Sequence, residues 1–171
     1  MNGRKPMPMR DERDEPVIHD KALAELSQMF LSYPSDPTPG SEALDVSRFD
    51  FSMESLGAMD EHLERMRTRQ LSDRDWNSFI LRSGAYVGEV IRRFTPPPKE
   101  WHWLAYEEAA ALQPFVASLG MSIDTAAVLW DGKDGVIFPL AKVVKYLKNG
   151  AEDGVKFYAQ VIVALPPELR Q

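Results

Sequence analysis

The most informative absence from this sequence is cysteine, which occurs at none of its 171 positions. Without thiols the chain forms no disulfide, binds no metal through thiolate and has no cysteine nucleophile. A cysteine-free chain suits a reducing compartment, and residues 1–16 lack the apolar core of a secretory signal. We therefore expect a cytoplasmic protein.

Long apolar runs and an excess of basic residues are also missing. No stretch approaches the ~20 consecutive apolar residues of a membrane-spanning helix, so we expect no membrane partner. The formal net charge is −6. Because contacts to phosphates need clustered lysine and arginine, we also expect no nucleic-acid partner.

Familiar catalytic and cofactor motifs are absent too. The sequence has no G-x-S-x-G elbow, no P-loop and no G-x-G-x-x-G fingerprint, and its three histidines lack the paired spacing of a zinc site. Asp60, Glu61 and Glu64 cluster around His62, but a solvated acidic face with Glu61 paired to Arg65 explains them better than a metal site. We expect no metal and no cofactor, and we lean against catalysis.

What the sequence does contain is one long amphipathic helix, predicted over residues 72–94. At ~100° per residue its apolar side chains form one stripe, and its polar side chains, including Glu89, fall on the opposite face. Ser72 and Asp75 resemble a capping box at its start. Three consecutive prolines end it, because proline lacks the amide donor that a helix needs.

The remaining pattern predicts an α+β fold. Helices over 19–31 and 52–68 precede the long helix, and the second forms an antiparallel helical hairpin with it. A small antiparallel sheet of about three strands follows, in which the DGKDG hairpin is the most secure element. A helix broken at Pro114 lies between the first two strands, and two C-terminal helices flank the sheet.

Length and composition predict the domain organisation. A chain of 171 residues, 44% of them apolar, is about one domain and can bury a sizeable core. Residues 1–16 are rich in proline and charge and are predicted to be a disordered tail. Residues 17–171 are predicted to form a single globular domain.

Two glycines one turn apart, Gly84 and Gly88, predict a close approach to the backbone of the long helix. We favour packing by another helix or a strand, and the alternative is a ligand on the bare backbone. A ligand pocket here would combine aromatic walls with polar groups. The candidate binding residues are Gly84, Tyr86, Gly88, Glu89, Trp101, His102, Trp103, Trp130 and Asn149. The competing interpretation places the tryptophans in the core and Glu89 in a solvated ion pair with Arg92 or Arg93.

Two stretches resemble segments of a known family. SGAYVGEVIRR followed by WHW is similar to an LGAY-x-GE-then-tryptophan pattern, and PLAKVVKYLKNGAEDGVKFYAQ is similar to a PL-x-KV-x-K-x-L-x-NG-x-ED segment. Both patterns belong to a family of small bacterial cytosolic proteins with a domain of unknown function. The resemblance covers residues 49–165 and implies a bacterial origin and one compact domain, with no catalytic residues to carry over. Ser83 and Gly154 depart from the leucine and serine of the family pattern.

These observations leave three functional hypotheses. The favoured one is a non-catalytic interaction protein, of adaptor, inhibitor or immunity type, whose negative charge attracts a basic partner in a salt-dependent way. The alternative is a small-molecule-binding protein or an enzyme with an aromatic pocket near the two glycines. The third is a homo-oligomer that buries an exposed apolar flank.

Overall fold

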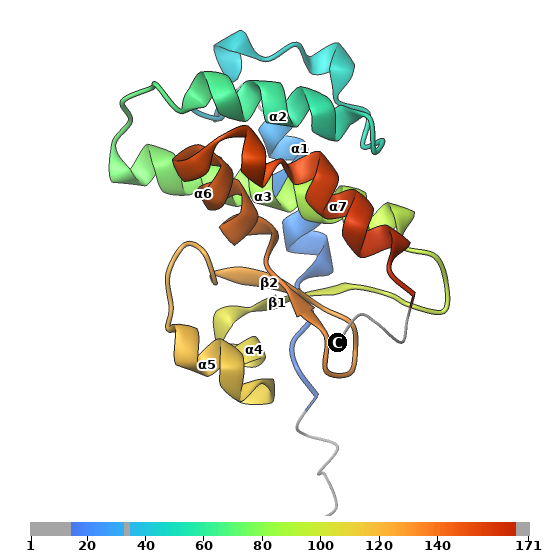
Figure 1. Ribbon diagram of the computed structural model, residues 1–171. Coiled ribbons are helices and arrows are strands. Elements are labelled where there is room, and N and C mark those ends of the chain that lie inside the picture. The colour runs from blue at the N-terminus through green and yellow to red at the C-terminus, as the bar shows by residue number, and fades with distance from the viewer. Residues whose placement is uncertain (1–14, 33–34, 167–171) are drawn as a thin grey trace, which may run out of the picture.

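The computed structural model describes residues 15–32 and 35–166 and has the predicted α+β architecture (Figure 1). Most of the predicted tail, residues 1–14, lies outside the described residues. The helices and strands in chain order are α1 (Asp20–Ser32), α2 (Ser55–Met66), α3 (Asp73–Phe94), β1 (His102–Ala105), α4 (Tyr106–Leu112), α5 (Pro114–Leu119), β2 (Ala127–Trp130), β3 (Val136–Ile137), α6 (Pro139–Asn149) and α7 (Val155–Ala164). Short 3₁₀ turns lie at η2 (Ser41–Ala43), η3 (Val46–Arg48) and η4 (Ala151–Asp153). No helix in the described ranges is long and apolar enough to cross a bilayer.

Helix α3 is the central element, and α1, α6 and α7 all pack against it (Figure 1). Its start is capped as predicted, because the Ser72 hydroxyl accepts the N–H of Asp75 at 3.1 Å. The prediction of one solvated face was wrong for the middle of the helix, where every residue from 82 to 91 is buried. Arg82 is enclosed there because it donates to the backbone oxygen of Asp36 at 2.8 Å and pairs with the carboxylate of the same residue.

Helices α2 and α3 follow one another through residues 67–72 and run in opposite directions, as the predicted hairpin requires (Figure 1). The hydroxyl of Ser52 accepts the N–H of Ser55 at 3.1 Å at the start of α2. The C-terminal helices α6 and α7 pack against both members of the hairpin. The N-terminal and C-terminal parts of the chain therefore share one core, which includes residues from Leu23 to Ile162.

The sheet is antiparallel, with the strand order β1-β2-β3. Strand β2 pairs with β1 through His102 opposite Trp130 and with β3 through Leu129 opposite Ile137. The predicted hairpin turn is confirmed, since the N–H of Asp131 donates to the oxygen of Gly135 at 3.0 Å.

Both faces of this small sheet are covered. Because successive strand residues point to opposite sides, Trp103 and Leu129 join the main core while Leu104 and Val128 join a second, smaller core. Helices α4 and α5 supply that second core. The break predicted between them is confirmed, with Pro114 opening α5.

Candidate functional site

The two glycines of α3 are approached by the protein's own side chains. A Cβ on Gly84 would lie 2.8 Å from the side chain of Leu140 in α6 and 2.9 Å from its Cα. A Cβ on Gly88 would overlap two ring carbons of Trp103, whose side chain is fully buried. The space predicted for a ligand is thus occupied by a helix at Gly84 and by a strand at Gly88, in agreement with the packing interpretation.

Glu89 lies at the centre of a buried polar network. One oxygen of its carboxylate accepts a hydrogen bond from the indole N–H of Trp103 at 2.8 Å and another from Arg92 at 2.8 Å. The expected pairing with Arg92 is confirmed, but the expected solvent exposure was wrong, because Glu89 is only 5% exposed. Helical position alone could not show this, since the indole that covers Glu89 comes from β1.

Asp20 extends this network from the first residue of α1. Its carboxylate accepts from Arg92 at 2.7 Å and from the backbone N–H of Trp103 at 2.6 Å, and it contacts Nδ1 of His102 at 3.0 Å. Three of the candidate binding residues, Glu89, His102 and Trp103, therefore come together with two residues outside the candidate set, Asp20 and Arg92. The carboxylates of Asp20 and Glu89 each accept hydrogen bonds from Arg92 and from an N–H group of Trp103, so the network links α1, α3 and β1.

The other polar candidates do not converge on this network. The Tyr86 hydroxyl shares a hydrogen bond of 2.7 Å with Ser55, and burial raises the pKa of Tyr86. The Asn149 amide is exposed and donates to Asp153 at 2.6 Å. The Trp130 indole donates to a backbone oxygen in the hairpin turn at 2.8 Å. The GAYVGE stretch is thus interior, whereas Asn149 and Asp153 belong to the surface.

The acidic cluster of α2 is paired within the protein. Glu61 contacts Arg48, with one hydrogen bond of 3.0 Å, rather than the expected Arg65, and this guanidinium lowers the pKa of Glu61. Asp60 accepts the N–H of Val155 at 2.7 Å and so caps α7, while burial raises the pKa of Asp60. Among the described residues, no group of three or more His, Asp or Glu side chains is arranged to hold a metal ion.

His62, expected beside this acidic cluster, is instead fully buried in the aromatic core. Its ring centroid lies 6.1 Å from that of Phe30 and 5.8 Å from that of Phe79. Neither ring nitrogen has a hydrogen-bond partner among the described residues, and burial lowers the pKa of His62 to about 4. We therefore assign His62 to the core.

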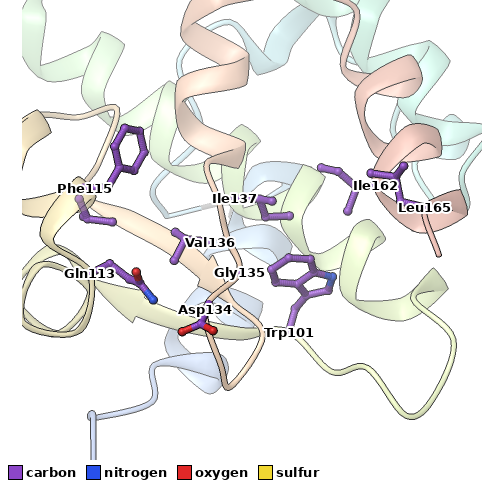
Figure 2. Close-up of a pocket in the computed structure, with 10 residues that line it drawn as sticks. Trp101, Gln113, Phe115, Asp134, Gly135, Val136, Ile137, Ile162 and Leu165 are labelled. Carbon is purple, nitrogen blue, oxygen red and sulfur yellow. The ribbon is translucent and has the colours of Figure 1, made fainter. Parts of the chain in front are cut away.

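Two apolar hollows lie between α5 and α7 and share Phe115 as a lining residue, and we call the surface that they form together the docking groove. Figure 2 shows the first hollow, with Phe115 on one side, Ile162 and Leu165 on the other, and Val136 and Ile137 between them. The second hollow lies beside α6 and is lined by Phe115, Leu119, Ser122, Asp124, Thr125, Phe138, Ala141, Lys142, Lys145 and Tyr158. Each hollow has a volume of about 390 Å³.

Phe115 forms the ridge between the two hollows, because it lines both. Its side chain is 63% exposed, and its ring meets that of Phe138 edge-on at 6.3 Å. Leu119 and Met121, which follow on the same segment, are 50% and 68% exposed. Bulky apolar side chains that project from a groove are typical of a surface that contacts another molecule.

Several charged side chains are among the residues that line the two hollows of the docking groove. Asp134 lies at the first hollow, is exposed, and has no hydrogen-bond or ion-pair partner among the described residues. Asp124 and Lys145 both line the second hollow. Lys142 pairs with Asp153 at 2.6 Å, which lowers the pKa of Asp153. The first hollow therefore carries an unpaired negative charge, whereas the second carries charges of both signs.

Of the nine predicted site residues, Trp101 lines the docking groove and the other eight do not. Trp101 is 3% exposed and forms part of the wall, with the ammonium of Lys99 4.3 Å from its ring centroid. The sequence did contain a signal for the groove residues near Phe115, because residues 109–123 carry no charge in a chain in which 27% of residues are charged. Only the structure shows that this segment is exposed.

Comparison with known proteins adds no assignment. No protein-family model, no curated protein and no solved structure matches the chain. The resemblance to a bacterial family stays a prediction, and the functional argument rests on the groove.

Proposed function

We propose that this chain is a non-catalytic interaction protein that binds a partner protein through the docking groove. The observation that carries the proposal is the exposed ridge of Phe115 between two apolar hollows. When a partner removes apolar surface of this kind from water, the free energy of the system falls, and this stabilises the complex.

The form of the groove favours an amphipathic helix as the bound element. The hollows succeed each other along α7, from Tyr158 in the second to Leu165 in the first. Seven residues of helix span ~10 Å, which is also the distance between side chains two turns apart on a partner helix. A helix that places two bulky apolar side chains at that spacing fills both hollows.

Charge indicates which kind of partner the docking groove favours. The net charge of −6 and the unpaired carboxylate of Asp134 favour a partner with basic residues beside its apolar anchors. Such a partner associates more slowly as salt rises, while the apolar contacts hold the complex once it has formed. We place this interaction in the cytoplasm, as the absence of cysteine suggests.

The test compares two variants that put the same charge on two exposed apolar sites. Phe115→Asp places a carboxylate on the ridge, and Val46→Asp places one on η3, where Val46 is 45% exposed and outside the groove. We expect a partner captured by the wild-type chain and purified to lose at least ~10-fold in affinity for Phe115→Asp, since the contact would desolvate a charge. Val46→Asp should bind normally, and circular dichroism should show both variants folded. Equal binding by both variants would refute the proposal.

A small molecule is the second candidate occupant, favoured by the volume of the first hollow. About 390 Å³ lies within the range of ligand pockets, and Trp101 supplies an aromatic wall. Titration with the apolar dye anilinonaphthalene sulfonate, followed by energy transfer from tryptophan, tests this alternative. Saturable binding that Ile162→Trp blocks and Phe115→Asp retains would favour the small molecule over the protein partner.

A further inference from the structure

The chain leaves its last helix at the rim of the first hollow of the docking groove. Helix α7 ends at Ala164, and the next residue, Leu165, lines the hollow on the side opposite Phe115 (Figure 2). Residues 167–171, with the sequence PELRQ, lie outside the described residues. An extended chain covers up to ~3.6 Å per residue, so Leu169 can lie up to ~14 Å from Leu165. This short segment can therefore reach across the first hollow.

The charge in the wall of the first hollow is opposite to one in this segment. Among the described residues that line the hollow, Asp134 is the only charged one, and its carboxylate is exposed and unpaired. In the segment, Arg170 follows directly after Leu169. An apolar side chain inside the hollow with a cation at the rim matches both the apolar wall and Asp134. Glu168, on the other side of Leu169, meets no cation among these lining residues and stays in water.

The wall of the first hollow also contains a buried donor without an acceptor. Trp101 is 3% exposed, and its indole N–H has no hydrogen-bond partner among the described residues. Figure 2 shows the indole nitrogen on the side of the ring toward Ile162 and Leu165. Buried N–H groups are nearly always hydrogen-bonded, because an unpaired one has lost its contact with water for no return. A peptide segment that continues from Leu165 over the hollow brings backbone carbonyl oxygens, which can accept this hydrogen bond.

We propose that residues 167–171 cover the first hollow, with Leu169 inside it and Arg170 paired with Asp134. The docking groove then has an occupant within its own chain, joined to it through α7. The N-terminal segment is placed less well for this role. It joins the described chain beside β1, where the N–H of His19 donates to the oxygen of Trp103 at 2.9 Å, and β1 lies at the opposite edge of the sheet from β3.

The consequence for a partner rests on the function proposed above. A partner protein has to displace the segment, so the apparent affinity is lowered to the extent that the first hollow is covered. The partner's anchor for this hollow should also resemble the segment, with an apolar residue followed by a basic one, as in Leu169 and Arg170. The chain's own segment therefore indicates the chemistry that the first hollow recognises.

The absence of cysteine allows a direct test on the full chain without any partner. Leu169→Cys combined with Val136→Cys, which replaces a residue of the first hollow, should form an intramolecular disulfide under mild oxidation, at a rate independent of protein concentration. Leu169→Cys combined with Leu119→Cys, which replaces a 50% exposed residue that lines only the second hollow, should link at least ~10-fold more slowly. Equal rates for the two pairs would overturn the proposal. So would equally fast linkage between Met9→Cys and Val136→Cys, which would assign the hollow to the N-terminal segment.

The charge pair is tested in the chain that carries Leu169→Cys and Val136→Cys. Asp134→Arg should slow the linkage roughly 3-fold, because Arg170 would then meet a like charge. Adding Arg170→Asp should restore the rate by recreating the pair with its signs exchanged. A rate that neither substitution changes would contradict the pairing of Arg170 with Asp134.

A purified partner tests the competition. Leu169→Ser should bind the partner at least ~2-fold more tightly than the wild type, because a segment that covers the hollow more than half of the time would be released. Unchanged affinity would overturn the competition. The two proposals fail separately: slow linkage of Leu169→Cys to Val136→Cys removes the segment from the hollow, whereas equal partner binding by Phe115→Asp and Val46→Asp removes the partner from the groove.

Discussion

Gly88→Ala should destabilise the protein, although alanine is the better helix former. Inside α3 the substitution gains about 1 kcal/mol from helix propensity. The added methyl group would overlap the Trp103 ring and lie 3.3 Å from a side-chain carbon of Leu129. Trp103 is fully buried, and its indole N–H is held by Glu89, so the ring has no free space to rotate into. Overpacking of this kind costs up to about 3 kcal/mol, which leaves a net loss of about 2 kcal/mol.

Gly57→Ala in α2 is the matched control. A Cβ at Gly57 would lie 3.7 Å from the nearest atom, a side-chain carbon of Lys156, which is an ordinary contact. This variant should gain up to about 1 kcal/mol, because only the propensity changes. Urea unfolding followed by tryptophan fluorescence and circular dichroism measures both variants. If Gly88→Ala is as stable as Gly57→Ala, the close packing of β1 on α3 is not as described.

Three further variants test buried polar groups. His62→Leu should remove a pH dependence of the folding stability. The pKa of His62 is about 4 in the folded state and near 6.5 in the unfolded state, so the wild type should lose up to about 3 kcal/mol of stability as pH falls from 6.5 to 4. Denaturant titrations of both proteins at several pH values measure this loss, which the variant should not show. Glu89→Ala should cost up to about 3 kcal/mol by leaving the buried Trp103 indole N–H without an acceptor and by removing one of the two carboxylates that pair with Arg92, whereas Glu89→Gln, which keeps an acceptor, should cost less. Asp60→Ala should cost about 1 kcal/mol of stability, because the N–H of Val155 at the start of α7 would lose its acceptor. Asp60→Asn, which keeps an acceptor oxygen, should lose less stability in thermal unfolding. Equal losses in the two variants would show that Asp60 does not stabilise α7 as a cap.

The local rules of the chain were readable from the sequence. Ser72 capped α3, Pro114 opened α5, and the DGKDG turn joined β2 to β3, because caps, prolines and tight turns act over a few residues. The two glycines of α3 correctly predicted a close packing contact. These signals, together with the apolar periodicity, were enough for the α+β class.

The burial of polar groups was decided by the tertiary structure. Periodicity placed Glu89 and Arg82 on a solvated face because it reports the composition of one helix and nothing of its neighbours. The residues that enclose them come from elsewhere: Asp36, for example, lies 46 positions before Arg82, which donates to it. No spacing rule connects such pairs, since chain folding alone sets the distance between them.

The sequence also revealed only part of what the surfaces with proposed functions are like. Composition alone showed a cysteine-free, acidic chain and a charge-free segment over residues 109–123. It could not show that Phe115 projects into solvent, or that α5, β3, α6 and α7 together line two hollows. Exposure depends on which neighbours cover a side chain, so the sequence by itself determined the elements and the charge, and the packing of those elements decided where a partner can bind.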